Sequence, residues 1–198
     1  DPTDGCSLVA ANQDATPSGA WNALDCDEDG VTNGQEITDG TDPTDGCSLV
    51  AANQDATPSA AWNALDCDED GVTNGQEITD GTDPTDGCSL VAANQDATPS
   101  AAWNALDCDE DGVTNGQEIT DGTDPTDGCS LVAANQDATP SAAWNALDCD
   151  EDGVTNGQEI TDGTDPTDGC SLVAANQDAT PSGAWNALDC DEDGVTNG

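Results

Sequence analysis

Residues 25–36 read DCDEDGVTNGQE, and this stretch fills every specified position of the pattern D-x-[DN]-x-[DN]-G-x₅-E. Asp25, Asp27 and Asp29 alternate along the chain, a glycine that permits a sharp turn follows, and Glu36 closes the stretch. Oxygen ligands in this order suit Ca²⁺, which takes about six to eight oxygens at about 2.3–2.6 Å. The stretch therefore predicts a calcium-binding loop of the EF-hand kind. The alternative is a solvated turn rich in Asp and Gly that holds no ion.

The predicted ligands have the same chemistry in every copy of the loop. They are three aspartates, the carbonyl of the valine after the glycine, an asparagine that acts through water, and the glutamate. The four complete copies supply Asp25, Asp27, Asp29, Val31, Asn33 and Glu36; Asp66, Asp68, Asp70, Val72, Asn74 and Glu77; Asp107, Asp109, Asp111, Val113, Asn115 and Glu118; and Asp148, Asp150, Asp152, Val154, Asn156 and Glu159. The fifth copy is cut before its glutamate and supplies Asp189, Asp191, Asp193, Val195 and Asn197.

The loop recurs because the whole chain is a tandem repeat with a period of 41 residues. The sequence predicts four complete repeats and a partial fifth: 1–41, 42–82, 83–123, 124–164 and 165–198. Only one position varies, which is Gly19 and Gly183 in the first and last repeats and alanine in the other three. Arrays of this kind normally carry distinct capping repeats, and the sequence has none. The sequence is therefore expected to be a segment of a longer array, or to have neighbouring chains as its caps.

The chain has 43 acidic residues and no lysine, arginine or histidine, which gives a formal net charge of −43. Because no salt bridge can neutralise these carboxylates, metal cations are the expected partners. Nucleic acids and anionic membranes need basic residues, so neither is expected. No stretch approaches the ~20 apolar residues of a membrane span, so we expect no membrane insertion. Without histidine or lysine the usual nucleophile–base chemistry is missing, and we expect no enzyme.

The charge of one repeat leaves room for a second metal site. One full repeat carries seven Asp and two Glu, which is more than a single Ca²⁺ balances. Asp39, Asp42 and Asp45 are the candidate ligands of that site. The alternative is that the segment Thr-Asp-Pro-Thr-Asp-Gly forms a turn with Asx-type hydrogen bonds.

Ten regularly spaced cysteines indicate an oxidising compartment, so the protein is expected to be extracellular or on the cell surface. The spacing allows Cys6–Cys26 pairing within a repeat, over 20 residues, or Cys26–Cys47 pairing across a repeat border, over 21. Loop-closure entropy does not separate the two, since either loop contributes about 3 kcal/mol. We favour the first pairing, which uses every cysteine: Cys6–Cys26, Cys47–Cys67, Cys88–Cys108, Cys129–Cys149 and Cys170–Cys190.

Local signals predict two short helices in each repeat. Thr16 is the expected N-cap of the first helix, with Pro17 at its first position and Leu24 at its end. Trp21 and Leu24 are three residues apart, so they are expected to share the face that forms the core. The second helix is expected over residues 33–38, and residues 6–9 are expected to form a short strand.

Residues 24–45, LDCDEDGVTNGQEITDGTDPTD, resemble the bacterial form of the thrombospondin type 3 repeat. The resemblance covers about half of each repeat and rests on Asp27, Asp29, Gly30, Thr32, Asn33, Glu36, Gly40, Thr41, Asp42 and Pro43. It implies a large secreted or cell-surface protein of Bacteroidetes-like bacteria, an adhesin or a stalk, in which calcium stiffens the chain.

Together these features predict a tandem array of small, loop-rich, mostly α units with EF-hand-like calcium loops, stapled by disulfides and with little regular β structure. The leading hypothesis is an extracellular stalk or filament made rigid by Ca²⁺ and disulfides, with copies of itself as partners. The second is a cell-surface adhesin whose repeats bind a glycan or protein, which exposed tryptophans would support. A third, a flexible acidic calcium buffer, predicts poor order without a fixed disulfide pattern.

Overall fold

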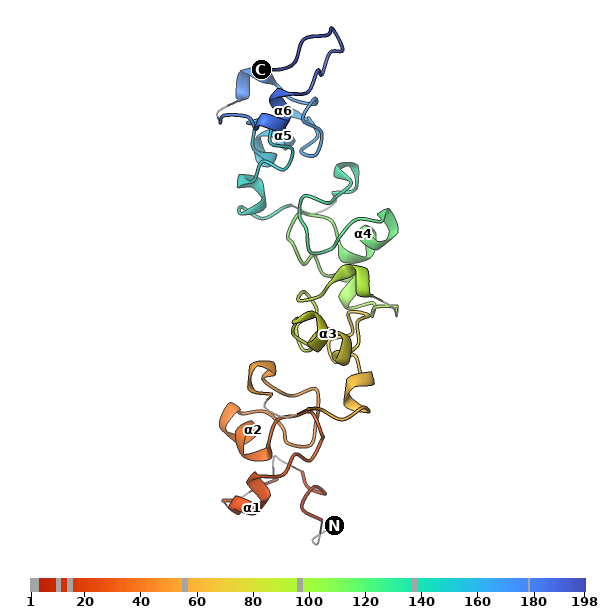
Figure 1. Cartoon of the computed structure of the whole chain (residues 1–198), viewed down its shortest axis with the longest axis vertical. Coiled ribbons are helices and arrows are strands. Elements are labelled where there is room, and N and C mark those ends of the chain that lie inside the picture. Colours follow the sequence, from red (N-terminus) through yellow and green to blue (C-terminus); the bar gives the residue numbers. More distant parts are fainter. Residues whose placement is uncertain are drawn as a thin grey trace. The chain divides into compact units, whose positions relative to one another are not determined.

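The computed structural model describes residues 4–9, 12–13, 16–54, 57–95, 98–136, 139–177 and 179–198. The chain forms two compact units, Asp1–Ser100 and Ala101–Gly198. Both consist of short helices joined by long loops (Figure 1), and no strand occurs in the described segments. No helix in these segments is long and apolar enough to cross a membrane. The chain is thus a tandem array of units of about 41 residues built from helices and loops, as the sequence predicts.

The helices are all short. The α-helices are α1 (Gly19–Asn22), α2 (Asn33–Asp39), α3 (Asn74–Asp80), α4 (Asn115–Asp121), α5 (Asn156–Asp162) and α6 (Gly183–Asn186). The 3₁₀-helices are η2 (Ala51–Asn53), η3 (Trp62–Ala64), η4 (Ala92–Asn94), η5 (Trp103–Ala105), η6 (Ala133–Asn135), η7 (Trp144–Ala146) and η8 (Ala174–Asn176).

Residues next to the helix after each loop determine where that helix begins and ends. At α2, Thr32 adopts an extended conformation, and its carbonyl accepts the first helical hydrogen bond from the Glu36 N–H. The helix ends at Gly40, whose φ of 80° lies in the left-handed region that glycine adopts without strain. The Gly40 and Thr41 N–H groups both donate to the Glu36 carbonyl. The predicted helix over 33–38 is therefore confirmed, with one further residue.

The helix around the tryptophan differs from the prediction. Ser18, and not Thr16, is the N-cap of α1: its Oγ accepts from the Trp21 N–H at 3.2 Å. The helix ends at Asn22, because the Leu24 carbonyl accepts from the Asn33 N–H at 2.8 Å and ties the chain to the far end of the loop. At the same place in the second to fourth repeats the structure forms only a 3₁₀ turn.

The core lies across the border between repeats. Val31 of the first repeat packs with Leu49 and Trp62 of the second, and these side chains are 0, 7 and 2% exposed. Val113, Leu131 and Trp144 form the same cluster in the second unit. The predicted core partner of the tryptophan, Leu24, is 44% exposed, so that prediction was wrong. The loop valine takes its place because the loop folds against the repeat that follows.

The expected strand over residues 6–9 is also wrong, and the described copies form turns instead. In the second repeat, Asp45 Oδ1 accepts from the Cys47 N–H at 3.2 Å, and the Asp45 carbonyl accepts from the Ser48 N–H at 2.7 Å. These local bonds satisfy backbone groups that a strand would have to pair with a neighbour.

Disulfides staple each repeat internally. Of the two pairings that the spacing allows, the structure contains the one within a repeat: Cys6–Cys26, Cys47–Cys67, Cys129–Cys149 and Cys170–Cys190. The Cα atoms of these pairs are 5.2–5.3 Å apart, within the usual range. Cys88 and Cys108 are disulfide-bonded as well, and no cysteine is free.

Candidate metal centre

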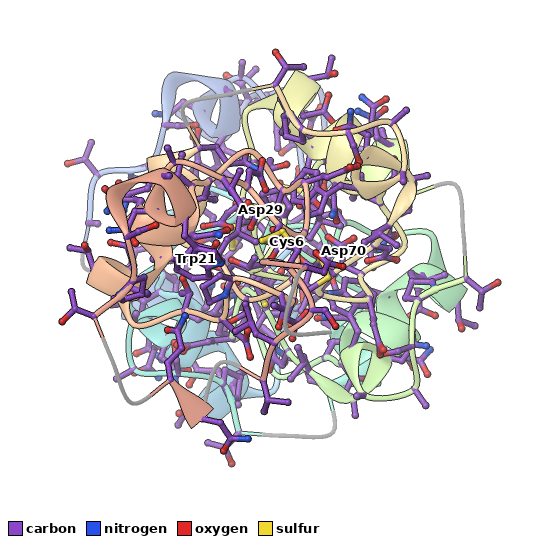
Figure 2. The ribbon with its side chains drawn as sticks, turned by 90° about the horizontal axis from the view of Figure 1, so that it is seen from below. Cys6, Trp21, Asp29 and Asp70 are labelled. Atoms are coloured by element: carbon purple, nitrogen blue, oxygen red, sulfur yellow. A yellow bond between two sulfur atoms is a disulfide. The ribbon has the colours of Figure 1, made fainter. Side chains whose placement is uncertain are left out.

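The three alternating aspartates of each loop converge. Asp25, Asp27 and Asp29 each place a carboxylate oxygen within 4.8 Å of the others, and the same holds for Asp66, Asp68 and Asp70; Asp107, Asp109 and Asp111; Asp148, Asp150 and Asp152; and Asp189, Asp191 and Asp193. Figure 2 labels Asp29 and Asp70, which hold the same loop position in successive repeats. The sequence pattern thus translates into a cluster of acidic oxygens at each loop.

The backbone of the loop holds this arrangement. Asp25 Oδ2 accepts from the Gly30 N–H at 3.1 Å, and Asp29 Oδ1 accepts from the Val31 N–H at 2.7 Å. Gly30 has φ 91°, which permits the sharp turn. Glu28 also has a positive φ, 63°, and so do its counterparts in the other four loops. Asp25 and Asp29 each use one carboxylate oxygen in these hydrogen bonds, so the other oxygen of each is left for another partner.

The glutamate from the helix after the loop lies near the three aspartates. Glu36 lies in the first turn of α2 and is 0% exposed, yet neither of its carboxylate oxygens has a hydrogen-bond partner. Burial, and then the charges of Asp27, Asp29 and Asp25, raises the pKa of Glu36 to about 8. Burial and the charge of Asp29 likewise raise the pKa of Asp27 to about 7. The charges of these aspartates act on Glu36 because its carboxylate lies near theirs.

The same orphaned oxygens occur in every complete loop. Glu77, Glu118 and Glu159 are also 0% exposed with both carboxylate oxygens unpartnered, and Asp29, Asp70, Asp111 and Asp152 each leave one buried oxygen unpartnered. Buried carboxylates without partners are costly unless a cation or hydrogen bond compensates them. The chain contains no lysine, arginine or histidine to do so. Three aspartates whose carboxylate oxygens converge, with a buried glutamate near enough for their charges to act on it, fit a hard cation that prefers oxygen ligands, as Ca²⁺ does.

The side chain of Asn33 holds the loop in place through hydrogen bonds. Its Oδ1 accepts from the Cys26 N–H at 3.1 Å, and its Nδ2 donates to the Trp21 carbonyl at 3.1 Å and contacts Cys26 Sγ at 3.2 Å. Asn33 thus connects the loop, the disulfide and the tryptophan helix. Its role as a ligand through water, like that of the Val31 carbonyl, stays a prediction.

The second predicted metal site, with Asp39, Asp42 and Asp45 as its ligands, stays a prediction. Among the described residues the clusters of three or more potential ligands are those of the five loops, and Asp39, Asp42 and Asp45 make none. Asp39 accepts from Gln35 Nε2 and Asn53 Nδ2, both at 2.8 Å. Asp42 Oδ1 accepts from both the N–H and the hydroxyl of Thr44, and Asp45 accepts from the Cys47 N–H. Asx-type turns, the alternative interpretation, therefore hold this segment.

Residues of the next repeat cover each complete loop. The Ser59 N–H donates to the Glu28 carbonyl at 3.0 Å, and Gln54 Nε2 donates to the Asp29 carbonyl at 2.6 Å. The same two bonds recur in the second unit, where Ser141 and Gln136 cover the loop from Asp107. Sequence reasoning missed these residues, because a period of 41 shows that every position recurs but not which positions meet.

Four segments match the family model of the bacterial TSP3 repeat. They are residues 25–46, 66–87, 107–128 and 148–169, and each contains one complete loop, its helix and the turn that follows. TSP3 repeats are calcium-binding repeats, so the resemblance noted for residues 24–45 is confirmed in these segments. No curated protein and no solved structure matches the chain. The four TSP3 segments leave the tryptophan part of each repeat without a match.

Proposed function

We propose that the chain is a structural calcium-binding repeat protein of an extracellular stalk or filament, in which Ca²⁺ and disulfides make each repeat rigid. The observation that carries the proposal is the glutamate of each complete loop, which is buried with both oxygens unpartnered and lies near the three converging aspartates. A cation at this point joins the loop to the start of the following helix. Because the loop also bonds to the next repeat, the ion would fix neighbouring repeats against each other.

The ligands we propose are the residues given above for each loop, with the carboxylates as the principal donors. Val31 and Asn33, with their counterparts, are the weaker part of the set, since the Asn33 amide already makes hydrogen bonds. The disulfides support an extracellular or cell-surface location. The adhesin alternative draws no support from the tryptophans, because Trp62, Trp103 and Trp144 are each only 2% exposed and form no platform for a ligand.

Calcium titration of the oxidised chain by calorimetry tests the proposal. We expect one site for each of the four complete loops. Glu77→Gln removes a charge and a bidentate ligand from one loop, and we expect the number of tight sites to fall by one. The matched control is Glu69→Gln, which makes the same chemical change in the same loop at a side chain that is exposed. We expect this control to leave the stoichiometry unchanged.

Two outcomes would contradict the proposal. An absence of saturable calcium binding would remove its basis. An equal loss of sites in Glu77→Gln and Glu69→Gln would mean that net charge, and not the enclosed carboxylate cluster, attracts the ion. The stalk or filament role itself predicts that calcium stiffens the array, which small-angle scattering of the same chain with calcium and with a chelator measures.

A further inference from the structure

Each complete loop contains an asparagine that is followed directly by a glycine. In the second repeat these are Asn74 and Gly75, the first two residues of α3. The other complete loops have the same pair as Asn33–Gly34, Asn115–Gly116 and Asn156–Gly157. In an unfolded chain this pair is chemically labile, because glycine has no side chain to hinder its nitrogen when it attacks the asparagine amide. A labile pair in every loop calls for a structural reason.

The asparagine is needed for the hydrogen bonds that its amide makes. Asn74 Oδ1 accepts from the Cys67 N–H at 3.0 Å, and Asn74 Nδ2 donates to the Trp62 carbonyl at 3.2 Å. The same two bonds recur at Asn115 and Asn156. A carboxylate accepts hydrogen bonds but donates none, so an aspartate at this position could make only the first bond.

The glycine is needed because the chain packs closely against it. A Cβ on Gly75 would lie 2.9 Å from Asn63 Cβ and 3.0 Å from the Asn63 carbonyl oxygen. The equivalent Cβ contacts at Gly34, Gly116 and Gly157 are also 2.8–2.9 Å. No larger residue fits there without a shift of the backbone. The contacts on each side of the pair therefore require both residues, although together they are labile.

The fold keeps the two reacting groups apart. Deamidation begins when the glycine nitrogen attacks the side-chain carbon Cγ of the asparagine and closes a five-membered ring. Asn74 is the first residue of α3, and helical side chains point back towards the N-terminus, away from the following nitrogen. Its side chain is 0% exposed and is held by Cys67 and Trp62. Ring closure therefore requires the loop to open first.

We propose that Asn74–Gly75 and its counterparts are latent deamidation sites, which the folded loop protects and which react when the loop opens. The Gly75 nitrogen forms a bond to Asn74 Cγ, the bond from Cγ to Nδ2 breaks, and ammonia leaves with the proton of the Gly75 N–H. Water then opens the cyclic imide at either carbonyl and gives aspartate or isoaspartate. The net reaction consumes one water and releases one ammonia.

The products prevent the loop from closing as before. The new carboxylate cannot donate to the Trp62 carbonyl, and it adds a negative charge beside Asp66, Asp68 and Asp70. Isoaspartate also lengthens the backbone by one carbon between the loop and α3. A transient opening thus becomes a permanent loss of that repeat. The inference goes beyond the proposed function and does not rest on it, because the protecting contacts are those of the chain itself.

Mass spectrometry of the aged chain tests the proposal. One sample is the oxidised chain in calcium, and the other is the reduced chain in chelator and urea at the same mildly alkaline pH and temperature. A protease specific for glutamate releases residues 70–77 and their identical counterparts as one peptide, which reports all complete loops together. We expect conversion of this peptide to be at least roughly tenfold slower in the folded sample. Asn63, which precedes Ala64, is the control in the same molecule and should stay unchanged in both samples.

A refolding assay tests whether the change is permanent. The unfolded chain is aged at mildly alkaline pH, or for the same time at mildly acid pH, where the glycine nitrogen keeps its proton and the ring does not close. After oxidative refolding in calcium, we expect only the acid-aged chain to regain native tryptophan fluorescence and a full set of disulfides.

Three results would overturn the proposal. They are equal conversion in the folded and unfolded samples, no conversion in the unfolded sample, and equal refolding of the two aged chains. Calcium titration by calorimetry is a separate measurement. A chain that binds no calcium but protects the pair when folded contradicts only the proposed function, and a chain that binds calcium but deamidates at the unfolded rate contradicts only this inference.

Discussion

The loop at residues 66–77 and the loop at 189–198 have the same first ten residues, yet their environments differ. In the first, Asp70 and Val72 are both 0% exposed, whereas in the second Asp193 is exposed and Val195 is 69% exposed. Both loops make the same internal hydrogen bonds to the backbone and have the same sharp turn. The loop sequence thus sets the local conformation, and the residues that follow it along the chain decide whether its carboxylates are buried.

The largest expected effect comes from removing calcium and then raising the pH. Burial raises the pKa of Glu77 to about 9 from a usual 4.5, and burial with the charge of Asp70 raises that of Asp68 to about 7. Between about pH 4.5 and pH 9, the folded calcium-free chain therefore holds more protons than the unfolded chain. Stability is fully present at acid pH and should fall as the pH rises towards 9.

Thermal melts in a chelator measure this fall, and hydrogen exchange locates it. We expect residues 66–77 to lose protection as the pH rises, while residues 189–198, already exposed, change little. Saturating calcium should abolish the trend, because the ion binds the ionised carboxylates. A melting temperature that does not depend on pH in the chelator would mean that the internal carboxylates are not desolvated as the structure has them.

The second-largest effect is expected when Trp62 or Trp21 is replaced by alanine. Trp62 is 2% exposed and packs on the loop of the preceding repeat, so Trp62→Ala should cost about 3–5 kcal/mol. Trp21 is only half-buried, so Trp21→Ala should cost clearly less. Urea unfolding of the two variants in calcium gives the comparison. Equal costs would place the main contacts of the tryptophan within its own repeat.

The smallest effect concerns the glycines. A Cβ on Gly75 would lie 2.9 Å from Asn63 Cβ and 3.0 Å from its carbonyl oxygen, so Gly75→Ala should destabilise by about 1–3 kcal/mol. Gly19→Ala meets no atom within 4 Å and gives the first repeat the alanine of the internal ones. It should be neutral or stabilise by up to about 1 kcal/mol. Thermal melts of both variants test this. A destabilising Gly19→Ala would contradict the open space that the structure has around Gly19.

Local structure was largely predictable from the sequence. The spacing of Asp25, Asp27 and Asp29 predicted a converging cluster, because alternate residues around a sharp turn point their side chains to one centre. The helix after the loop was predictable because turn-forming residues lie on both sides of it. The period of 41 residues followed directly from the identity between repeats. These features depend on neighbours within a few residues, which the repeat sequence contains in full.

Long-range contacts were not predictable. The sequence left the cysteine pairing open, since separations of 20 and 21 residues cost the same entropy, and only the fold brings Cys6 to Cys26. It suggested Leu24 as core, yet Val31 is buried, because the loop packs against Leu49 and Trp62 of the next repeat. By itself the sequence determined the period, the acidic loop and the absence of basic residues that could balance its charge. Only the tertiary structure decided which repeat covers which loop, because that depends on contacts between residues far apart in the chain, and a repeating sequence offers the same partner in every copy.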